Sequence, residues 1–192
     1  MEPTVGRRPG GRSARVRAAV LAATLEEVAE RGGRFSVEGV ASRAGVHKTT
    51  VYRRWPTRGA LLLEALLERS SVEVPMPDTG TVEGDVRALM HAIVVNLQSQ
   101  LASGVVRALV DEPDDRELRA AALAFWRERF SLVAGVITRG VERGELTRDT
   151  DPDLLIELLI GPLYLRLLVT LEPLTEAYAN RVVEMVLRAC RL

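Results

Sequence analysis

The residues best suited to chemistry lie in one short segment, HKTTVYRRW, at positions 47–55. A helix turns by about 100° per residue, so Val51 and Trp55 point in nearly the same direction. Thr49 and Arg53 lie almost opposite them. The segment therefore has one apolar face that can pack on a core and one outer face with hydroxyl and guanidinium groups. Such groups donate hydrogen bonds to phosphate oxygens and to the edges of bases.

The charge around this segment has one sign. No acidic residue occurs between positions 41 and 59, whereas an ordinary solvated helix mixes both signs. Residues 1–60 hold twelve Arg or Lys and five Asp or Glu, while residues 61–192 hold fourteen and twenty-one, although the whole chain has no net charge. Chance clustering of solvated charges is the simplest alternative. The asymmetry instead favours a basic part that binds a polyanion and a second part with another role.

Two short helices joined by a turn are predicted to position the segment. Ser36 is a favourable N-cap for the first helix, whose apolar stripe consists of Val37, Val40, Ala41 and Ala44. Gly45 follows at the point where helices often end with a left-handed glycine. Pro56 restricts Trp55 to extended conformations, so the second helix must be short. A capped helix, a glycine turn and a short second helix form a helix-turn-helix.

The segment at the N-terminus is rich in Gly, Pro and Arg. Such a composition cannot build a core, so residues 1–12 are predicted to be a disordered basic tail. Its arginines, Arg7, Arg8 and Arg12, either follow a groove of DNA or remain solvated.

The remaining chain is predicted to be all-α, with two domains. Residues 13–70 form an N-terminal three-helix helix-turn-helix DNA-binding domain, which also includes a linking fourth helix that begins after Thr57. The prolines and glycine of residues 72–80 mark a break. Residues 71–192 form a second domain, a C-terminal helical bundle. Only 4% of the residues are aromatic, a composition that suits helices better than sandwiches or barrels.

The second domain is predicted to consist of long helices. Apolar stripes and breaks place them at 86–101, 118–141, 152–170 and 174–192, with a turn at 111–115. Asp151 followed by Pro152 is a typical helix start. The last two helices carry apolar residues on more than one face, as buried helices do. We therefore expect them to form a homodimer interface that includes Val183 and Leu187.

The chain lacks the residue patterns of a catalytic or metal site. Its single cysteine, Cys190, cannot form an intramolecular disulfide, and two histidines 44 residues apart do not complete a metal site with it. No Ser-His-Asp arrangement or phosphate-binding loop is present. We expect no enzyme activity, no metal and no cofactor.

The expected location is the cytoplasm. The N-terminal residues have no apolar core of the kind found in signal peptides, and a single cysteine suits a reducing compartment. The most apolar stretch, 154–171, is interrupted by Glu157, Pro162 and Arg166, so a membrane span is a poor interpretation. We therefore expect no membrane partner.

Residues 16–66 resemble the N-terminal DNA-binding domain of TetR/AcrR-type transcriptional regulators, most clearly in the stretch FSVEGVASRAGVHKTTVYRRWPTRGALL. The resemblance rests on the Ala-Gly-Val turn, the tyrosine, the aromatic residue three positions later and the basic residue after it. More loosely, residues 139–146 and 151–169 resemble the C-terminal domain of one branch of the family. The resemblance implies a homodimer formed mainly by the last two long helices and repression that a small ligand relieves.

The resemblance also implies roles for individual residues. Tyr52, Arg58 and Ser36 would contact phosphates, and Ser36 would also cap its helix. Five other residues would supply base and backbone contacts: Lys48, Thr49, Thr50, Arg53 and Arg54. His47 departs from the family pattern, in which a small cap such as Ser is usual, so the cap of the recognition helix stays open. Its imidazole either contacts DNA or is an exposed turn residue.

A small-molecule effector would require a pocket in the second domain. The polar or aromatic residues in its predicted helices include His91, Asn96, Gln100, Trp126, Arg129, Tyr164 and Arg166. Of these, we take as the candidate pocket residues His91, Asn96, Trp126, Tyr164 and Arg166. Each could instead belong to the core or to the surface. Arg166 is the most suggestive because apolar residues surround it on the chain, although it could also pair with a carboxylate across a dimer interface.

These features together predict a DNA-binding transcriptional regulator. Two copies would bind the halves of a palindromic operator in double-stranded DNA, and a small molecule would release the repressor. The alternative is an architectural DNA-binding dimer without a ligand. About 110 residues follow the break, more than dimerisation alone needs, so we favour the regulator.

Overall fold

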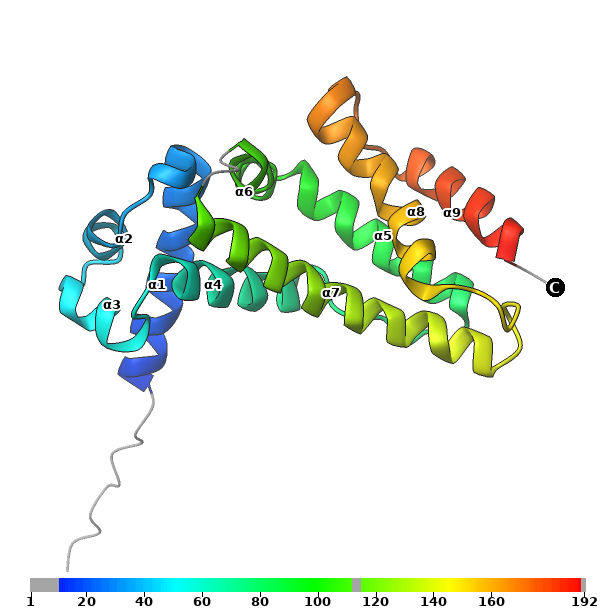
Figure 1. Cartoon of the computed structure of the whole chain (residues 1–192), viewed down its shortest axis with the longest axis horizontal. Helices are drawn as coiled ribbons and strands as arrows, with labels where there is room; N and C mark the ends of the chain where they lie inside the picture. Colours follow the sequence, from blue (N-terminus) through cyan, green and yellow to red (C-terminus); the bar gives the residue numbers. More distant parts are fainter. Residues whose placement is uncertain (1–10, 112–114, 191–192) are drawn as a thin grey trace, which may run out of the picture.

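The computed structural model describes residues 11–111 and 115–190, and within them every regular element is a helix (Figure 1). The predicted all-α fold is thus confirmed. Figure 1 shows α2 and α3 at one end of the molecule and α8 and α9 toward the other, with α4 and α7 running between them. The predicted disordered tail falls largely outside the described residues, and α1 already begins at Gly11.

The N-terminal part has the predicted helices. Their bounds are Gly11–Arg31 for α1, Val37–Arg43 for α2, Lys48–Arg54 for α3 and Arg58–Glu73 for α4, with a 3-10 turn at Gly32–Arg34 after α1. Val51 and Trp55 are buried with residues of α1, α2 and α4 in one core. The apolar face deduced from their spacing is therefore the face that packs.

Local hydrogen bonds explain where the short helices begin and end. Ser36 Oγ accepts the backbone N–H of Gly39 at 3.0 Å, and Thr57 Oγ1 accepts that of Ala60 at 3.1 Å. Gly45 has φ +65°, the left-handed conformation that ends α2. His47 Nδ1 accepts the N–H of Thr49 at 3.4 Å, so an imidazole nitrogen takes the place of the usual small cap. These contacts allow two helices to follow each other within a few residues.

The C-terminal part contains five α-helices among the described residues. They are α5 at Val82–Gln98, α6 at Gln100–Asp111, α7 at Arg116–Glu142, α8 at Pro152–Leu165, and α9 at Glu176–Cys190. A π-helical turn, Arg166–Thr170, continues α8. Asp151 caps α8, as predicted, by accepting the N–H groups of Asp153 and Leu154. Residues 112–114 of the predicted turn lie outside the described residues, and Asp115 caps α7.

The expectation of one continuous helix over 86–101 is wrong. The chain bends by 87° between α5 and α6, at Ser99, whose backbone is extended. Ser99 Oγ donates to the carbonyl of Asn96 at 2.8 Å and accepts the N–H of Ala102 at 3.2 Å, so one side chain ends α5 and begins α6. The apolar period continues through the bend because both helices pack on apolar neighbours. Periodicity alone therefore hides the break.

The bend sends α6 across α1. A Cβ atom added at Gly104 of α6 would lie 3.1 Å from the Cβ of Ala29, so the glycine permits this close approach. Val105 and Ala108 of α6 belong to the same core as the helices of the DNA-binding part. The connection after α4 is thus a break in helical structure, while apolar packing continues from one part to the other.

The outermost helix, α9, packs its apolar side against α5. Val183 and Leu187 are fully buried by this contact within the chain. Their assignment to a dimer interface is therefore wrong, because the intrachain core already covers them. Apolar side chains that remain exposed on α8 and α9 include Leu154, Leu158, Leu165 and Met185.

No single helix of the described residues is long and apolar enough to cross a membrane. Only α5 and α6 taken together reach the length and hydropathy of a span, and they are bent by 87° at their junction.

The turn at Gly45 gives a first prediction. Gly45→Ala should lower the free energy of unfolding by about 1–2 kcal/mol, because a left-handed conformation is strained for residues with a Cβ atom. Gly135→Ala is the matched control, since Gly135 lies in α7 with only the flexible tip of Arg139 within 4 Å. The control should raise stability by up to about 1 kcal/mol. Urea denaturation at equal protein concentrations measures both effects. If Gly45→Ala and the wild type had the same free energy of unfolding, a Cβ atom at this position would cause no strain and the prediction would be wrong.

Candidate functional site

The outer face of α3 is exposed. Lys48, Thr49 and Arg53 point away from the core, and Tyr52 is 44% exposed at its edge. Val51 and Trp55 hold the opposite side in place, because both are buried among the helices of the N-terminal part. A short, rigidly packed helix therefore presents its polar side chains together at one end of the molecule (Figure 1).

The three cations of α3 differ in how free they are. Lys48 Nζ lies 3.5 Å from Glu38, and Arg54 Nη2 lies 3.7 Å from Glu64 while its guanidinium covers the ring of Trp55. Arg53 forms no ion pair with a described residue, so its five N–H donors are available to an external acceptor. Arg53 and Arg54, although adjacent in the helix, thus differ in whether they pair with a carboxylate of the described residues.

A shallow surface hollow lies between the start of α1 and α3. Its lining includes four arginines and Thr50: Arg12, Arg17, Thr50, Arg53 and Arg54. Arg17 is held by Glu64 and Glu68 at 2.6 and 2.9 Å, which ties α1 to α4 and steadies this wall. A hollow lined by guanidinium groups suits the phosphate backbone of a nucleic acid.

Two of the predicted phosphate contacts have structural roles within the chain. The Oγ of half-buried Ser36 accepts a helix N–H. Arg58 donates to the carbonyls of Gly33 and Phe35 at 2.8 and 3.0 Å, and its Nη2 lies 2.6 Å from Asp115 Oδ2. Since Asp115 begins α7, Arg58 links the DNA-binding part to the second domain. A phosphate contact by Arg58 stays a prediction that would require it to exchange these partners.

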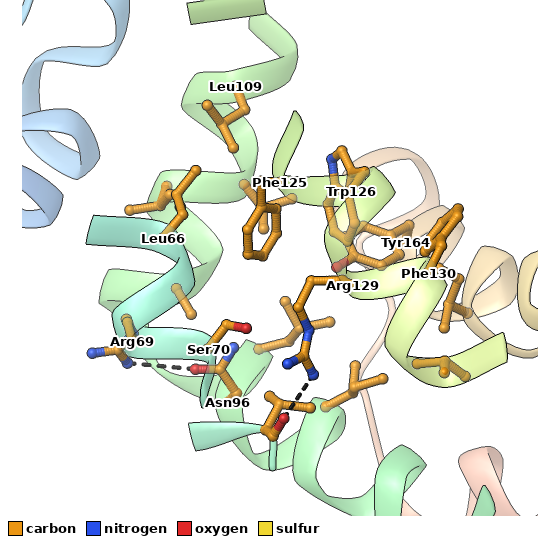
Figure 2. Close-up of a pocket in the computed structure, with 18 of the residues that line it drawn as sticks. Leu66, Arg69, Ser70, Asn96, Leu109, Phe125, Trp126, Arg129, Phe130 and Tyr164 are labelled. Atoms are coloured by element: carbon orange, nitrogen blue, oxygen red, sulfur yellow. Dashed lines mark hydrogen bonds between the residues drawn. The ribbon is translucent and has the colours of Figure 1, made fainter. Parts of the chain in front are cut away.

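A second site is an apolar pocket at the junction of the two parts (Figure 2). It encloses about 110 Å³ and includes three of the predicted pocket residues, Asn96, Trp126 and Tyr164. Its wall also contains Leu25 of α1 and Leu66 of α4, which belong to the DNA-binding part. The pocket is therefore shared between the domains instead of lying wholly inside the second one.

The structure does not bring His91 and Arg166 to this pocket. His91 lies on the side of α5 that faces α9, where its Nδ1 is 3.0 Å from Glu176. Arg166 stands at the end of α8, pairs with Glu172 at 2.9 Å and stacks 3.5 Å from the ring centre of Tyr178. Both side chains therefore hold helix ends together on the outside of the bundle.

Arg129 is the pocket residue that the sequence could not single out. It is only 9% exposed, and its Nη2 donates to the carbonyl of Val74 at 2.6 Å. Burial lowers the pKa of Arg129, because removal from water penalises the charged form. Burial also raises the pKa of Tyr164, so that its phenol stays neutral. In the sequence, Arg129 looks like any surface arginine of a helix. Only the packing of the helices shows that its side chain lies among apolar neighbours.

Comparisons with known proteins agree with this geometry. The family model described as "Bacterial regulatory proteins, tetR family" matches residues 20–65, and the model described as "Tetracyclin repressor-like, C-terminal domain" matches residues 76–186. The HTH-type transcriptional regulator AqdR of Rhodococcus erythropolis is 36% identical over 157 residues, which cover 81% of this chain and 76% of AqdR. The DNA-binding transcriptional repressor TetR of Mycobacteroides abscessus is 32% identical over 88% of this chain and 90% of its own length.

Solved structures share the same arrangement of helices. The TetR family transcription regulator SCO0332 is 30% identical, covers 92% of this chain and 99% of its own, and superposes with a TM-score of 0.76. FadR from Bacillus subtilis, solved in complex with stearoyl-CoA, shares the fold at a TM-score of 0.72 and 19% identity, over 88% of this chain and 97% of its own. The recognition helix, the shared pocket and both family models lead to one conclusion: the chain belongs to the TetR family of DNA-binding transcriptional regulators.

Proposed function

We propose that the protein is a repressor that binds a palindromic operator as a homodimer and leaves it when a small molecule fills the pocket between its domains. The observation that carries this proposal is the composition of the pocket wall. Leu25 and Leu66 come from helices that support the recognition helix, while Trp126 and Tyr164 come from the second domain. A ligand in this pocket touches both parts at once, so its binding free energy can change their relative position.

Helix α6 supplies the mechanical connection. Ala102 and Val105 of α6 line the pocket, and Gly104 on the same helix approaches Ala29 of α1. A ligand that displaces α6 therefore displaces α1, and with it the helix-turn-helix. In a dimer, the two recognition helices must be spaced by about 34 Å to enter successive major grooves. A small rotation of each DNA-binding part is enough to lose that spacing.

What is known of two relatives by their descriptions supports each half of this proposal. The relative from Mycobacteroides abscessus is described as a repressor, and FadR of Bacillus subtilis was solved with stearoyl-CoA bound. The pocket of this chain also favours a ligand-responsive regulator over an architectural dimer, because a concave, mainly apolar pocket with a few polar groups is typical of a ligand site.

The exposed apolar side chains of α8 and α9 support a dimer formed by these helices. Leu154 and Leu158 lie one helical turn apart on α8. Leu165 and Val169 extend the row, and Met185 of α9 is also exposed. Exposed large apolar groups that gather on two helices of one region are typical of a protein interface. Two copies packed through α8 and α9 would form a four-helix bundle.

The guanidinium of Arg53, which pairs with none of the described carboxylates, supports a role in reading bases. An arginine in the major groove can donate two hydrogen bonds to O6 and N7 of one guanine. Arg54 points to the flank, close to Glu64 and Trp55, and is therefore assigned to a phosphate. Five residues around Arg53 are proposed to complete the contact with the phosphate backbone and the bases of the DNA: His47, Lys48, Thr49, Thr50 and Tyr52.

The dimer gives one prediction. Leu158→Glu should yield monomers, because two carboxylates would be buried against each other across the two-fold axis. Val72→Glu is the matched control, since Val72 is 73% exposed at the end of α4, outside α8 and α9. Sedimentation velocity at several concentrations measures the association. If Leu158→Glu sediments as the same dimer as Val72→Glu, the interface lies elsewhere.

The recognition helix gives the prediction that tests the function most broadly. Selection from randomised DNA with the purified wild type should recover a palindrome. Arg53→Ala should lose the preference at one base pair of each half-site, a discrimination worth roughly 1–3 kcal/mol. Arg54→Ala is its matched partner and should weaken binding to all sequences alike while the consensus stays unchanged. A wild type that selects no inverted repeat would remove the operator proposal, and an unaltered consensus with Arg53→Ala would remove Arg53 from the reading residues.

A further inference from the structure

Arg129 places a positive charge in the pocket without a negative partner. No described carboxylate forms an ion pair with it, and its Nη2 donates a hydrogen bond to the carbonyl of Val74 at 2.6 Å. A carbonyl satisfies one N–H donor of five and leaves the charge uncompensated. Buried guanidinium groups are ordinarily paired with an anion, because desolvation of the lone charge is costly. The free protein therefore holds an arginine that an anionic ligand would stabilise.

Two further polar groups of the pocket are donors without an acceptor. Among the described residues, Arg69 Nε and Ser70 Oγ are buried and have no hydrogen-bond partner, although Arg69 Nη2 donates to Asn96 Oδ1 at 3.4 Å and Arg69 Nη1 lies 3.9 Å from Glu73. Arg69 is also a lining residue, and the described lining contains two arginines and no Asp or Glu. Figure 2 shows Arg69, Ser70 and Asn96 on one side of the cavity and Arg129 and Tyr164 on the other. An anion bound between them would find donors on both sides.

The remaining wall is aromatic. The ring centre of Trp126 lies 5.0 Å from that of Phe125, 5.9 Å from Phe130 and 5.5 Å from Tyr164, with the Phe125 and Tyr164 rings edge-on. Rings in such an arrangement favour a further ring over a flexible chain, because edge-to-face contacts add to burial. The cavity of about 110 Å³ is of the order of one that holds benzene. The space therefore holds one ring, and the adjoining hollow, which Trp126, Phe130 and Tyr164 also line, gives room for a second.

We propose that the effector is an aromatic carboxylate of one or two rings, with its carboxylate paired to Arg129 and its rings against Trp126. A guanidinium and a carboxylate can form two parallel hydrogen bonds, which also orients the ligand. The neutral phenol of Tyr164 and the hydroxyl of Ser70 supply further donors from the two sides. The inference rests on the proposed role of this pocket as the effector site and names the chemical class that the pocket selects. An aliphatic carboxylate offers the same charge without the rings, so the test must separate the two.

The experiment is calorimetric titration of the full-length protein with three probes. 2-Naphthoate carries rings and charge, 2-naphthamide carries the rings alone, and octanoate carries the charge on an aliphatic chain. We expect 2-naphthoate to bind at least tenfold more tightly than either of the others. Equal affinity of 2-naphthamide would overturn the role of the charge, and equal affinity of octanoate would overturn the aromatic class. Absence of binding by 2-naphthoate would overturn the proposal entirely.

Two variants assign the effect to Arg129. Arg129→Met should remove the preference for 2-naphthoate over 2-naphthamide, whereas Arg129→Lys keeps the positive charge and should retain part of it. If Arg129→Met does not fold, Arg129→Gln takes its place. A preference for the acid that survives in the neutral variant would contradict the pairing with Arg129.

A DNA-binding measurement separates this inference from the proposed function. The selected operator is titrated with the protein in the presence and absence of 2-naphthoate. Release of DNA by 2-naphthoate would support both the proposed function and the ligand class. Binding of 2-naphthoate through Arg129 without any change in operator affinity would leave the ligand class in place and contradict the proposed release. Release of DNA by 2-naphthamide as readily as by 2-naphthoate would support an effector site and contradict the carboxylate.

Discussion

The bend at Ser99 is the constraint on which the joint between the two domains depends. One hydroxyl ends α5 and begins α6, and the resulting angle of 87° directs α6 across α1 instead of along the bundle. Gly104 then allows the backbones of α6 and α1 to approach, which puts α6 into the core of the DNA-binding part. A straight helix over the same residues would leave the N-terminal domain connected to the bundle mainly through α4. The bend therefore adds α6 to the packing between α4 and α7 and places it in the wall of the pocket.

Glutamates of α1 and α4 are paired with arginines of neighbouring helices. Arg43 pairs with three glutamates of α1, Glu26, Glu27 and Glu30. Arg17 pairs with two glutamates of α4, Glu64 and Glu68. These pairs stiffen the helices behind the recognition helix. The outer face of α3 keeps Arg53 free, and Arg58 joins the two domains through Asp115. Of the acidic groups in the N-terminal part, Glu38 and Glu64 lie beside cations of α3, Lys48 and Arg54.

Features set by a few neighbouring residues were predictable from the sequence. The caps at Ser36, Thr57 and Asp151 and the turn at Gly45 depend on local chemistry, and the buried face of α3 follows from the spacing of Val51 and Trp55. Features that depend on how helices pack were not. The apolar period runs unchanged through Ser99, so it concealed the bend. His91 and Arg166 resemble Arg129 as polar residues on helices, and the assembled core alone shows that Arg129 turns inward.

The affinity for the operator of a variant at Gly104, where α6 approaches Ala29 of α1, tests most directly whether the position of α6 controls the DNA-binding part. Gly104→Val imitates a ligand by forcing α6 away from α1, because even a Cβ atom there meets Ala29 at 3.1 Å. Arg107→Val introduces the same side chain at an exposed position of α6. Gly104→Val should remain a folded dimer, and its affinity for the operator should fall by about 5–150-fold, the usual range for coupled sites. Arg107→Val should also remain a dimer, and its operator affinity should fall far less. Folded Gly104→Val that binds the operator as tightly as the wild type would contradict the account.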